Sequence, residues 1–210
     1  ELGATNSTIN TYIQAFNHLA QCCKSHGYDS DFMDDIHGLP KQQPTIIPLS
    51  VEESKRLLNT GLDYKNRNGV DCSDLDFKYL ALTGFILFTA CRFNEAASLT
   101  IKQLDIDNKR ALLTGTKNKE NRFIFFNGPI IEYLRSLVKE RNQEDLVFTN
   151  SKGNKMLNGD FDNNLKRRAR NAGITKKINA HLLRHTYATI YYNYTHDIAM
   201  VASILGHKDI

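Results

Sequence analysis

A short segment of the sequence, AHLLRHTYAT at positions 180–189, contains His181, Arg184 and His185. If this segment is helical, the three residues are three and four positions apart and project from neighbouring positions of one face. An imidazole titrates near neutral pH and can move a proton, and a guanidinium group holds negative charge at any ordinary pH. The spacing permits an acid–base site, a zinc site or simple packing, and does not by itself decide among them.

A pair of histidines four residues apart also suits a zinc ion. In helical metalloproteases with this pattern, a glutamate directly after the first histidine serves as general base, whereas Leu182 follows His181 here. The sequence offers no third ligand at a recognisable spacing. We therefore predict no metal site and no cofactor, and a zinc hydrolase built on His181 and His185 is the weaker alternative.

Arg92 lies in the segment TACRFNEAASL, directly after the most apolar run of the chain. An arginine that enters a protein core needs an anionic partner, because an unpaired buried charge is strongly unfavourable. Glu95, three residues further along, can provide that partner. Taken alone, the two residues predict an internal ion pair.

Three other segments also have simple explanations when each is taken alone. TGTKNKENR holds Lys117, Lys119 and Arg122 and is typical of a solvated turn between strands. LGHKD brings His207 close to the end of the chain. The HLLR segment is compatible with a structural histidine beside a surface arginine.

The composition indicates a folded protein in a reducing compartment. Of 210 residues, 41% are hydrophobic and 24% are charged. Lys and Arg exceed Asp and Glu by 27 − 23 = 4, and the isoelectric point near 8.8 permits a polyanionic partner. The four cysteines form no CxxC pair, so we expect buried thiols and a cytoplasmic location. The apolar run YLALTGFILFTAC is too short to cross a bilayer, which argues against a membrane partner and predicts a core helix over 79–91.

Residues 1–38 are expected to be the C-terminal part of a separate domain. The helical spacing of apolar residues from Ile9 to Ala20 predicts a helix with Asn6 or Ser7 as its N-cap. A lone amphipathic helix must bury its apolar stripe against something. The three prolines of GLPKQQPTIIPLS then predict an extended linker at 39–49, followed by a second domain at 50–210.

The second domain is predicted to be mainly α-helical with a small antiparallel β-sheet. Ser50 and Glu53 form a capping box at the start of a helix. Runs that favour β-structure are found at 104–107, 111–114 and 122–126. Further helices are expected at 129–140, 160–172, 181–194 and 197–205, the last of which ends at Gly206.

The order of these motifs resembles the catalytic, DNA breaking–rejoining domain of the tyrosine recombinases, the phage integrase family. The matching features are RxxE after a buried helix, a lysine in a β-hairpin, HxxR at the start of a helix, and LGH near the end. The helix before the linker resembles the last helix of that family's core-binding, SAM-like domain. The resemblance implies site-specific recombination or integration of double-stranded DNA, by a full-length protein that assembles as a tetramer on DNA and requires no metal.

The resemblance also implies roles for the charged residues. Arg92 and Arg184 would hold the non-bridging oxygens of the scissile phosphate, on which negative charge builds up. Lys117, or Lys119 in its place, would protonate the leaving 5′ oxygen.

The histidines and the nucleophile complete the implied site. His181 would take the proton of an attacking phenol, and His207 would hydrogen-bond a phosphate oxygen. The nucleophile, which forms a 3′-phosphotyrosyl bond, is expected on a helix beyond LGH, and the chain stops at Ile210 before it. We therefore expect these 210 residues to bind DNA without cleaving it covalently. Four other tyrosines share the HxxR helix, which argues against them as the nucleophile: Tyr187, Tyr191, Tyr192 and Tyr194. The spacing of Tyr187, Tyr191 and Tyr194 predicts one packing face.

Two alternatives of the same fold class remain open at this point. One is a DNA-binding module without catalytic activity, and the other is an enzyme that resembles the type IB topoisomerases, which use the same phosphotyrosyl chemistry. The linker and the preceding helix favour the integrase interpretation.

Overall fold

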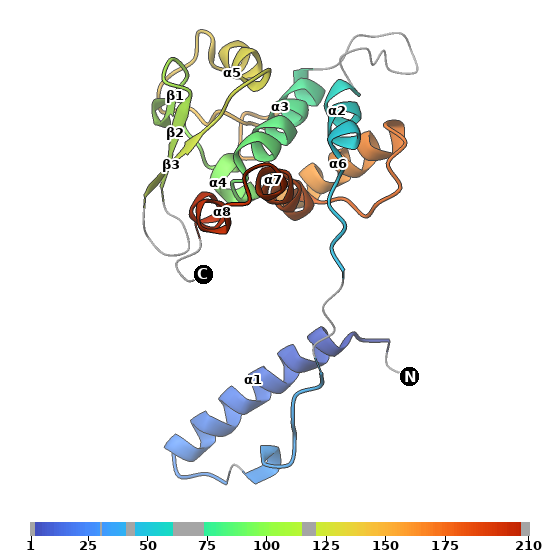
Figure 1. Ribbon diagram of the computed structural model, residues 1–210. Coiled ribbons are helices and arrows are strands. Elements are labelled where there is room, and N and C mark those ends of the chain that lie inside the picture. The colour runs from blue at the N-terminus through green and yellow to red at the C-terminus, as the bar shows by residue number, and fades with distance from the viewer. Residues whose placement is uncertain (1–2, 30, 41–44, 61–73, 115–120, 207–210) are drawn as a thin grey trace. The chain divides into compact units, whose positions relative to one another are not determined.

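The computed structural model describes residues 3–29, 31–40, 45–60, 74–114 and 121–206 (Figure 1). The chain forms two compact units, Glu1–Ile46 and Ile47–Ile210. Lys117, Lys119 and His207 lie outside the described residues, as does Cys72. No described helix combines the length and the apolar character needed to cross a membrane.

The first unit contains the predicted amphipathic helix, α1 (Asn6–Ser25), and a short 3₁₀ helix, Asp31–Met33. The N-cap of α1 is Thr5, whose hydroxyl accepts a hydrogen bond from the Thr8 backbone, so the predicted cap at Asn6 or Ser7 was wrong. The apolar stripe is largely uncovered, since the side chain of Phe16 is 53% exposed. Cys22 is also exposed, which corrects the prediction that the cysteines are buried.

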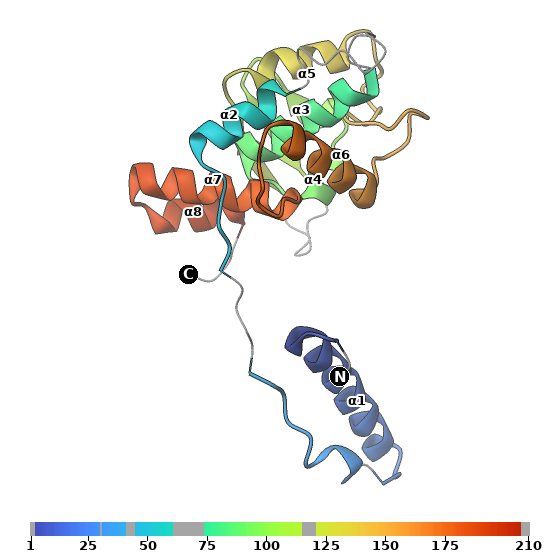
Figure 2. The ribbon, with the colours of Figure 1, turned by 90° about the vertical axis from the view of Figure 1, so that its right-hand side faces the viewer.

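Helix α3 (Asp74–Thr89) lies at the centre of the second unit (Figures 1 and 2). It is buried around nearly its whole circumference because its sequence is apolar on all sides, and this confirms the predicted core helix. The predicted range of 79–91 was wrong at both ends, because the helix begins at Asp74 and the left-handed Ala90 ends it after Thr89. Phe85 stands at the middle of the core, with its ring centroid 5.3 Å from that of Phe148 and 6.0 Å from that of Phe126. The helices packed against α3 are α2 (Val51–Asn59), α4 (Phe93–Ala97), α5 (Ile130–Val138), α6 (Asn158–Asn171) and α7 (Ala180–Thr195).

A three-stranded antiparallel sheet of order β1-β2-β3 confirms the predicted change to β-structure. Its strands are β1 (Leu104–Asp105), β2 (Arg110–Leu113) and β3 (Arg122–Phe125). The first strand is shorter than predicted because Asp105 accepts hydrogen bonds from the backbone and side chain of Asn108 and closes a tight turn. Leu113 pairs with Arg122, so β2 and β3 flank the segment that contains residues 115–120.

Helix ends follow the capping chemistry expected from the sequence. The predicted capping box of Ser50 and Glu53 is present at α2. Asn179 caps α7 by accepting a hydrogen bond from the Leu182 backbone. The last described helix, α8 (Ile198–Leu205), ends at Gly206, whose φ of 64° confirms it as a left-handed C-cap. These elements confirm the predicted class, mainly α-helical with a small antiparallel sheet.

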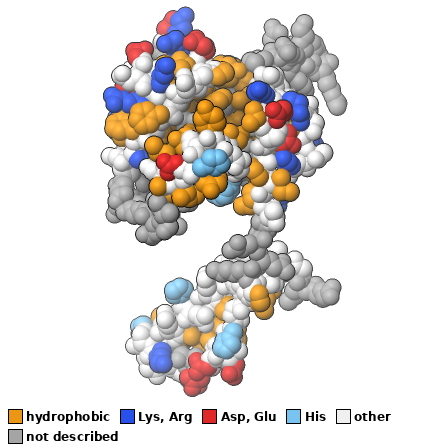
Figure 3. All heavy atoms as spheres, in the orientation of Figure 1, with side chains coloured by type: hydrophobic (Ala, Val, Ile, Leu, Met, Phe, Trp, Pro, Cys, Tyr) orange, Lys and Arg blue, Asp and Glu red, His pale blue; other side chains and the backbone are white. Residues whose placement is uncertain are grey.

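An apolar groove of about 590 Å³ lies between α2, α3 and α7. Tyr187 and Tyr191 stack in it with ring centroids 5.8 Å apart, as their spacing predicted. Tyr194 lines the same groove but is 88% exposed, so the prediction that it packs was wrong. Figure 3 shows that hydrophobic side chains gather near the middle of this face of the second unit.

Candidate active site

A second cleft, of about 1110 Å³, opens where α4 meets the first turns of α6 and α7. It brings together three of the five residues singled out in the sequence, namely Arg92, His181 and Arg184. The other two, Lys117 and His207, lie outside the described residues, so their positions stay predictions. Residues from α4 and α7 are far apart in the chain, and both helices pack on α3, which is what brings them to one cleft.

Arg184 faces inward from α7 and is only 5% exposed, so the alternative of a surface arginine is excluded. Its guanidinium donates one hydrogen bond of 2.6 Å to the carbonyl of Ala90 and another to the carbonyl of Leu205. Burial, together with repulsion from Arg92, lowers the pKa of Arg184 to about 10. The group therefore stays positively charged at neutral pH and is held at two points.

Ala90 has an unusual backbone conformation. Its φ of 53° lies in the left-handed region, which costs roughly 1–2 kcal/mol for a residue with a β-carbon. This conformation occurs in the turn between α3 and α4, and the carbonyl of Ala90 receives the hydrogen bond from Arg184. Such strain persists only where the surrounding structure enforces it, and often at functional sites.

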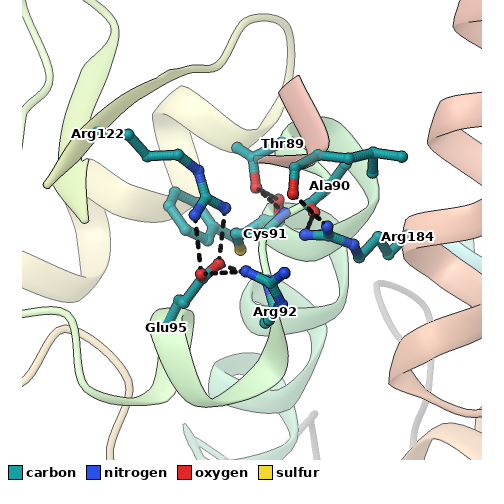
Figure 4. Close-up of polar contacts among 9 residues, drawn as sticks. Thr89, Ala90, Cys91, Arg92, Glu95, Arg122 and Arg184 are labelled. Atoms are coloured by element: carbon teal, nitrogen blue, oxygen red, sulfur yellow. Dashed lines mark hydrogen bonds and ion pairs between the residues drawn. The ribbon is translucent and has the colours of Figure 1, made fainter. Parts of the chain in front are cut away.

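Arg92 forms the predicted ion pair with Glu95, with 3.1 Å between Nη1 and Oε1. The Arg92 side chain is nevertheless 42% exposed and lines the cleft, so the expectation that it enters the core was wrong. Glu95 has a second partner in Arg122, which donates bonds of 2.9 and 2.8 Å to its two oxygens (Figure 4). Sequence reasoning placed Arg122 in a solvated turn and missed this contact, because no local pattern links β3 to α4.

The Glu95 carboxylate is ionised and surrounded by positive charge. Burial raises its pKa, but hydrogen bonds from Arg122 and from the Arg92 backbone outweigh burial and leave the pKa below its ordinary value. Burial raises the pKa of the neighbouring Cys91 thiol to about 12, so the thiol is neutral. Two guanidinium groups, those of Arg92 and Arg122, contact the Glu95 carboxylate (Figure 4). Arg184 adds a third positive charge nearby, and the excess of positive charge suits an anionic ligand.

His181 stands exposed at the rim of the cleft, in the first turn of α7. Its ring contacts that of His185 edge-to-face, with the centroids 4.5 Å apart, which confirms that the two histidines share a face. Arg184, by contrast, points toward the core. The backbone N–H of Ala180 donates to Asp162 on α6, at 3.2 Å, and fixes the start of α7 beside the cleft.

Lys155 is a further cation at the cleft that the sequence did not reveal. It follows a tight turn closed by a bridge between Thr149 and Lys155, and its Nζ donates to the Ser98 hydroxyl at 2.6 Å. A lone lysine in a polar turn carries no local signal that separates it from other surface lysines. Among the described residues, no three His, Cys, Asp or Glu side chains are grouped so as to hold a metal ion.

The similarity to known proteins covers most of the chain. A model of the phage integrase family matches residues 49–210. The tyrosine recombinase XerC of Bacillus subtilis is 31% identical over 219 aligned positions, which cover 100% of this chain and 69% of that protein. XerC of Lactobacillus leichmannii is 29% identical over 188 residues, covering 82% of this chain, and the match spans only 62% of that protein's length.

Solved structures share the fold. The XerH site-specific recombinase bound to palindromic difH substrate, in a post-cleavage complex, superposes with a TM-score of 0.78 at 25% identity, over 99% of this chain and 62% of that one. A lambda integrase dimer bound to a COC′ core site gives 0.76 at 11% identity, over 97% of this chain and 73% of that one, a likeness of fold alone. The fold is that of a tyrosine recombinase catalytic domain. The family match over 49–210 and the identity to XerC agree with the motifs in the cleft, and the chain belongs to the phage integrase family, the tyrosine recombinases.

Proposed function

We propose that the complete protein breaks and rejoins DNA at specific sites, and that the cleft of Arg92 and Arg184 holds the scissile phosphate. The observation that carries this proposal is the meeting of two cleft arginines with the exposed His181 in a pocket of excess positive charge. Fixed guanidinium groups stabilise the charge that develops on the non-bridging oxygens, and they do so without reorganisation.

The proposed reaction is a direct displacement at phosphorus. A tyrosine hydroxyl, which the family resemblance places beyond His207, attacks the phosphorus while His181 takes its proton. The bond to the 5′ oxygen breaks, and Lys117, or Lys119 in its place, gives that oxygen a proton. The resulting 3′-phosphotyrosyl ester keeps the energy of the broken bond, so the 5′ hydroxyl of another strand can reverse the step.

The positions of neighbouring described residues support roles for the two residues that lie outside them. Thr114, the last described residue before 115–120, lines the cleft, and this supports the assignment of Lys117 to the proposed phosphate site. Leu205, two residues before His207, gives its carbonyl to Arg184. On this basis we assign His207 a hydrogen bond to a phosphate oxygen.

Double-stranded DNA is the proposed partner. The XerH structure with its difH substrate supports this choice through its similarity over nearly the whole chain. We assign residues 1–38 to the end of a core-binding domain, 39–49 to a linker and 50–210 to the catalytic domain. Hydrogen bonds from Leu49 to Thr186 and from Lys176 to the Pro48 carbonyl hold the end of that linker on the second unit.

Assembly as a tetramer on DNA is part of the same proposal. The apolar groove between α2, α3 and α7 supports it, because an apolar hollow of about 590 Å³ suits an apolar helix from a neighbouring subunit. Light scattering measures the mass of the protein–DNA complex and so tests this assembly. A complex that never contains more than one protein per DNA site contradicts the proposed tetramer.

The test of catalysis uses the complete gene product and a duplex selected for tight binding and nicked near the centre of the site. Release of a short strand prevents rejoining, so we expect a covalent protein–DNA adduct without added metal. Arg184→Ala should abolish the adduct, and Arg110→Ala, on β2, should not. DNA binding without any adduct supports the binding-module alternative, and relaxation of supercoils without joining of sites supports the topoisomerase alternative.

A further inference from the structure

We propose that Arg122 is a positioning residue that fixes Arg92 through Glu95 and is itself held in place by Gly206. This inference rests on the proposed function, because its consequence is the alignment of Arg92 with the scissile phosphate. In this proposal, Arg122 on β3 and Gly206 at the end of α8 together position the cleft arginine at the start of α4.

Glu95 is a shared acceptor between the two arginines. Oε1 accepts from Nη1 of Arg122 at 2.9 Å and from Nη1 of Arg92 at 3.1 Å. Oε2 accepts from Nη2 of Arg122 at 2.8 Å and from the backbone N–H of Arg92 at 2.7 Å. Two parallel bonds from one guanidinium fix the plane of a carboxylate as well as its position. Arg122 therefore determines how Glu95 presents its oxygens to Arg92.

Arg92 depends on this arrangement because it has little else to hold it. Its side chain is 42% exposed, and among the described residues Glu95 is its one hydrogen-bond partner. An exposed arginine on a flexible stem samples many rotamers unless its head group is held. Glu95 is 6% exposed and Arg122 is 18% exposed, so the fixed part of the triad is the Glu95–Arg122 pair.

Gly206 lies next to the Arg122 guanidinium. A β-carbon at Gly206 would lie 3.2 Å from Nη1 and 3.3 Å from Cζ of Arg122 (close contacts on the head group itself). Gly173 has a similar φ, 68° against 64°, but among the described residues no atom beyond its own chain neighbours lies within 4 Å of the corresponding position. Glycine at 206 is thus favoured twice, by the left-handed backbone and by the approach of Arg122.

The Nε atom of Arg122 supports this interpretation. It is buried and has no hydrogen-bond partner among the described residues. A buried donor without a partner destabilises a fold, so its presence needs an explanation. Both Nη groups are committed to Glu95, and Nε faces Gly206, where a β-carbon would lie 3.5 Å from it. Arg122 does not line the cleft, which makes it a positioning residue and not a catalytic one.

The decisive experiment compares adduct formation on ordinary DNA with adduct formation on DNA that carries a methylphosphonate at the scissile position. The methyl group removes the negative charge that Arg92 is proposed to balance. On ordinary DNA, Arg122→Met in the complete gene product should slow the adduct about tenfold to a hundredfold, part of the effect of deleting a charge stabiliser. On the methylphosphonate, Arg122→Met and Arg92→Ala should both recover toward the wild-type rate. General damage to the fold would not be rescued in this way.

A double-mutant cycle checks that Arg122 acts through Arg92. In the Arg92→Ala background, Arg122→Met should cause no further loss on ordinary DNA, because the group that it positions is already gone. Gly206→Ala is the second variant, in case Arg122→Met does not fold. It should slow the adduct more in the wild-type background than in the Arg92→Ala background, because its effect passes through Arg92. Gly173→Ala, which carries the same backbone strain, should leave the rate unchanged.

The outcomes separate this inference from the proposed function. If the wild-type protein forms no adduct on nicked DNA, both proposals fail. If the wild type forms the adduct and Arg122→Met does so at the same rate, only the positioning role fails. It also fails if the loss from Arg122→Met persists on the methylphosphonate while that from Arg92→Ala is rescued, or if the two losses multiply in the cycle.

Discussion

Arg184 and Ala90 are joined by a hydrogen bond of 2.6 Å that links α7 to the turn directly before Arg92. The donor is a buried guanidinium, and the acceptor belongs to a residue whose φ of 53° is unfavourable for any side chain with a β-carbon. The two cleft arginines are therefore set relative to each other by backbone geometry as well as by their own side chains.

The two-point attachment of Arg184 predicts the effect of a conservative substitution. Arg184→Lys keeps the positive charge but cannot reach the carbonyls of both Ala90 and Leu205 while facing a phosphate. We expect a loss of stability of about 1–3 kcal/mol, since a buried carbonyl loses its partner, and a loss of adduct formation of about a hundredfold. Urea unfolding and single-turnover adduct rates measure the two effects. If Arg184→Lys forms the adduct at the wild-type rate, the two-point attachment of Arg184 is not needed for its role.

The strain at Ala90 predicts that glycine does not destabilise the protein at this position. Ala90→Gly relieves roughly 1–2 kcal/mol of left-handed strain and loses roughly 0.5–1 kcal/mol in backbone entropy, so the variant should be as stable as the wild type or more stable by up to about 1.5 kcal/mol. Ala169→Gly, at a buried position inside α6, relieves no strain and should destabilise by about 1 kcal/mol or more. The comparison of the two free energies of unfolding is the measurement. An equal loss at both positions argues that Ala90 is not strained.

Glu95 should make stability depend on pH in one direction. Burial raises its pKa, but hydrogen bonds from Arg122 and Arg92 outweigh burial and leave the pKa below the ordinary value of 4.5. A carboxylate with a lowered pKa in the folded state stabilises the protein above its unfolded-state pKa, and that stability is lost as the pH falls through the folded-state pKa.

Glu95→Gln tests this dependence. At pH 7 the variant should be less stable by about 3 kcal/mol, because two arginines lose a buried anion. The difference between wild type and variant should shrink as the pH falls below about 4.5, where the protonated carboxyl comes to resemble the amide. Chemical unfolding at both ends of this range measures the difference. A gap that does not change with pH contradicts an ionised Glu95.

DNA binding by the 210-residue chain should be weak and steeply dependent on salt, because contacts with phosphate release condensed counterions. Lys155→Ala should lower the slope of log Kd against log salt by about one unit if its cleft position faces DNA. Lys152→Ala is the matched control, since Lys152 is exposed in the same turn but does not line the cleft. Titration of a labelled duplex at several salt concentrations measures both. Equal slopes for the two variants exclude Lys155 from the interface.

The general-acid assignment predicts a selective rescue. Lys117→Ala in the complete gene product should stop cleavage of ordinary DNA but not of DNA with a 5′-bridging phosphorothiolate, whose sulfur leaves without a proton. Arg184→Ala should not be rescued by this substrate, because its role is to hold charge. If Lys119→Ala shows the rescue and Lys117→Ala does not, the two lysines exchange roles.

Local patterns in the sequence determined the elements and most of the helix ends. The capping box at Ser50, the uniformly apolar run of α3 and the C-cap at Gly206 were each predicted correctly. Each of these signals depends only on residues close to it in the sequence. The separation of four residues between His181 and His185 similarly placed both on one face of α7. Thr5 replaced the predicted cap because several neighbouring residues could cap α1, and helix starts are hard to distinguish at that level.

Only the tertiary structure decided what the charged residues contact. Arg184 was as compatible with the surface as with the core, until packing of α7 on α3 buried it against Ala90. The sequence predicted that Arg122 belongs to a solvated turn. Its pairing with Glu95 arises because β3 lies beside α4. Periodicity and capping act over one or two turns of chain, whereas these ion pairs join residues distant in sequence, whose meeting depends on how the whole core packs.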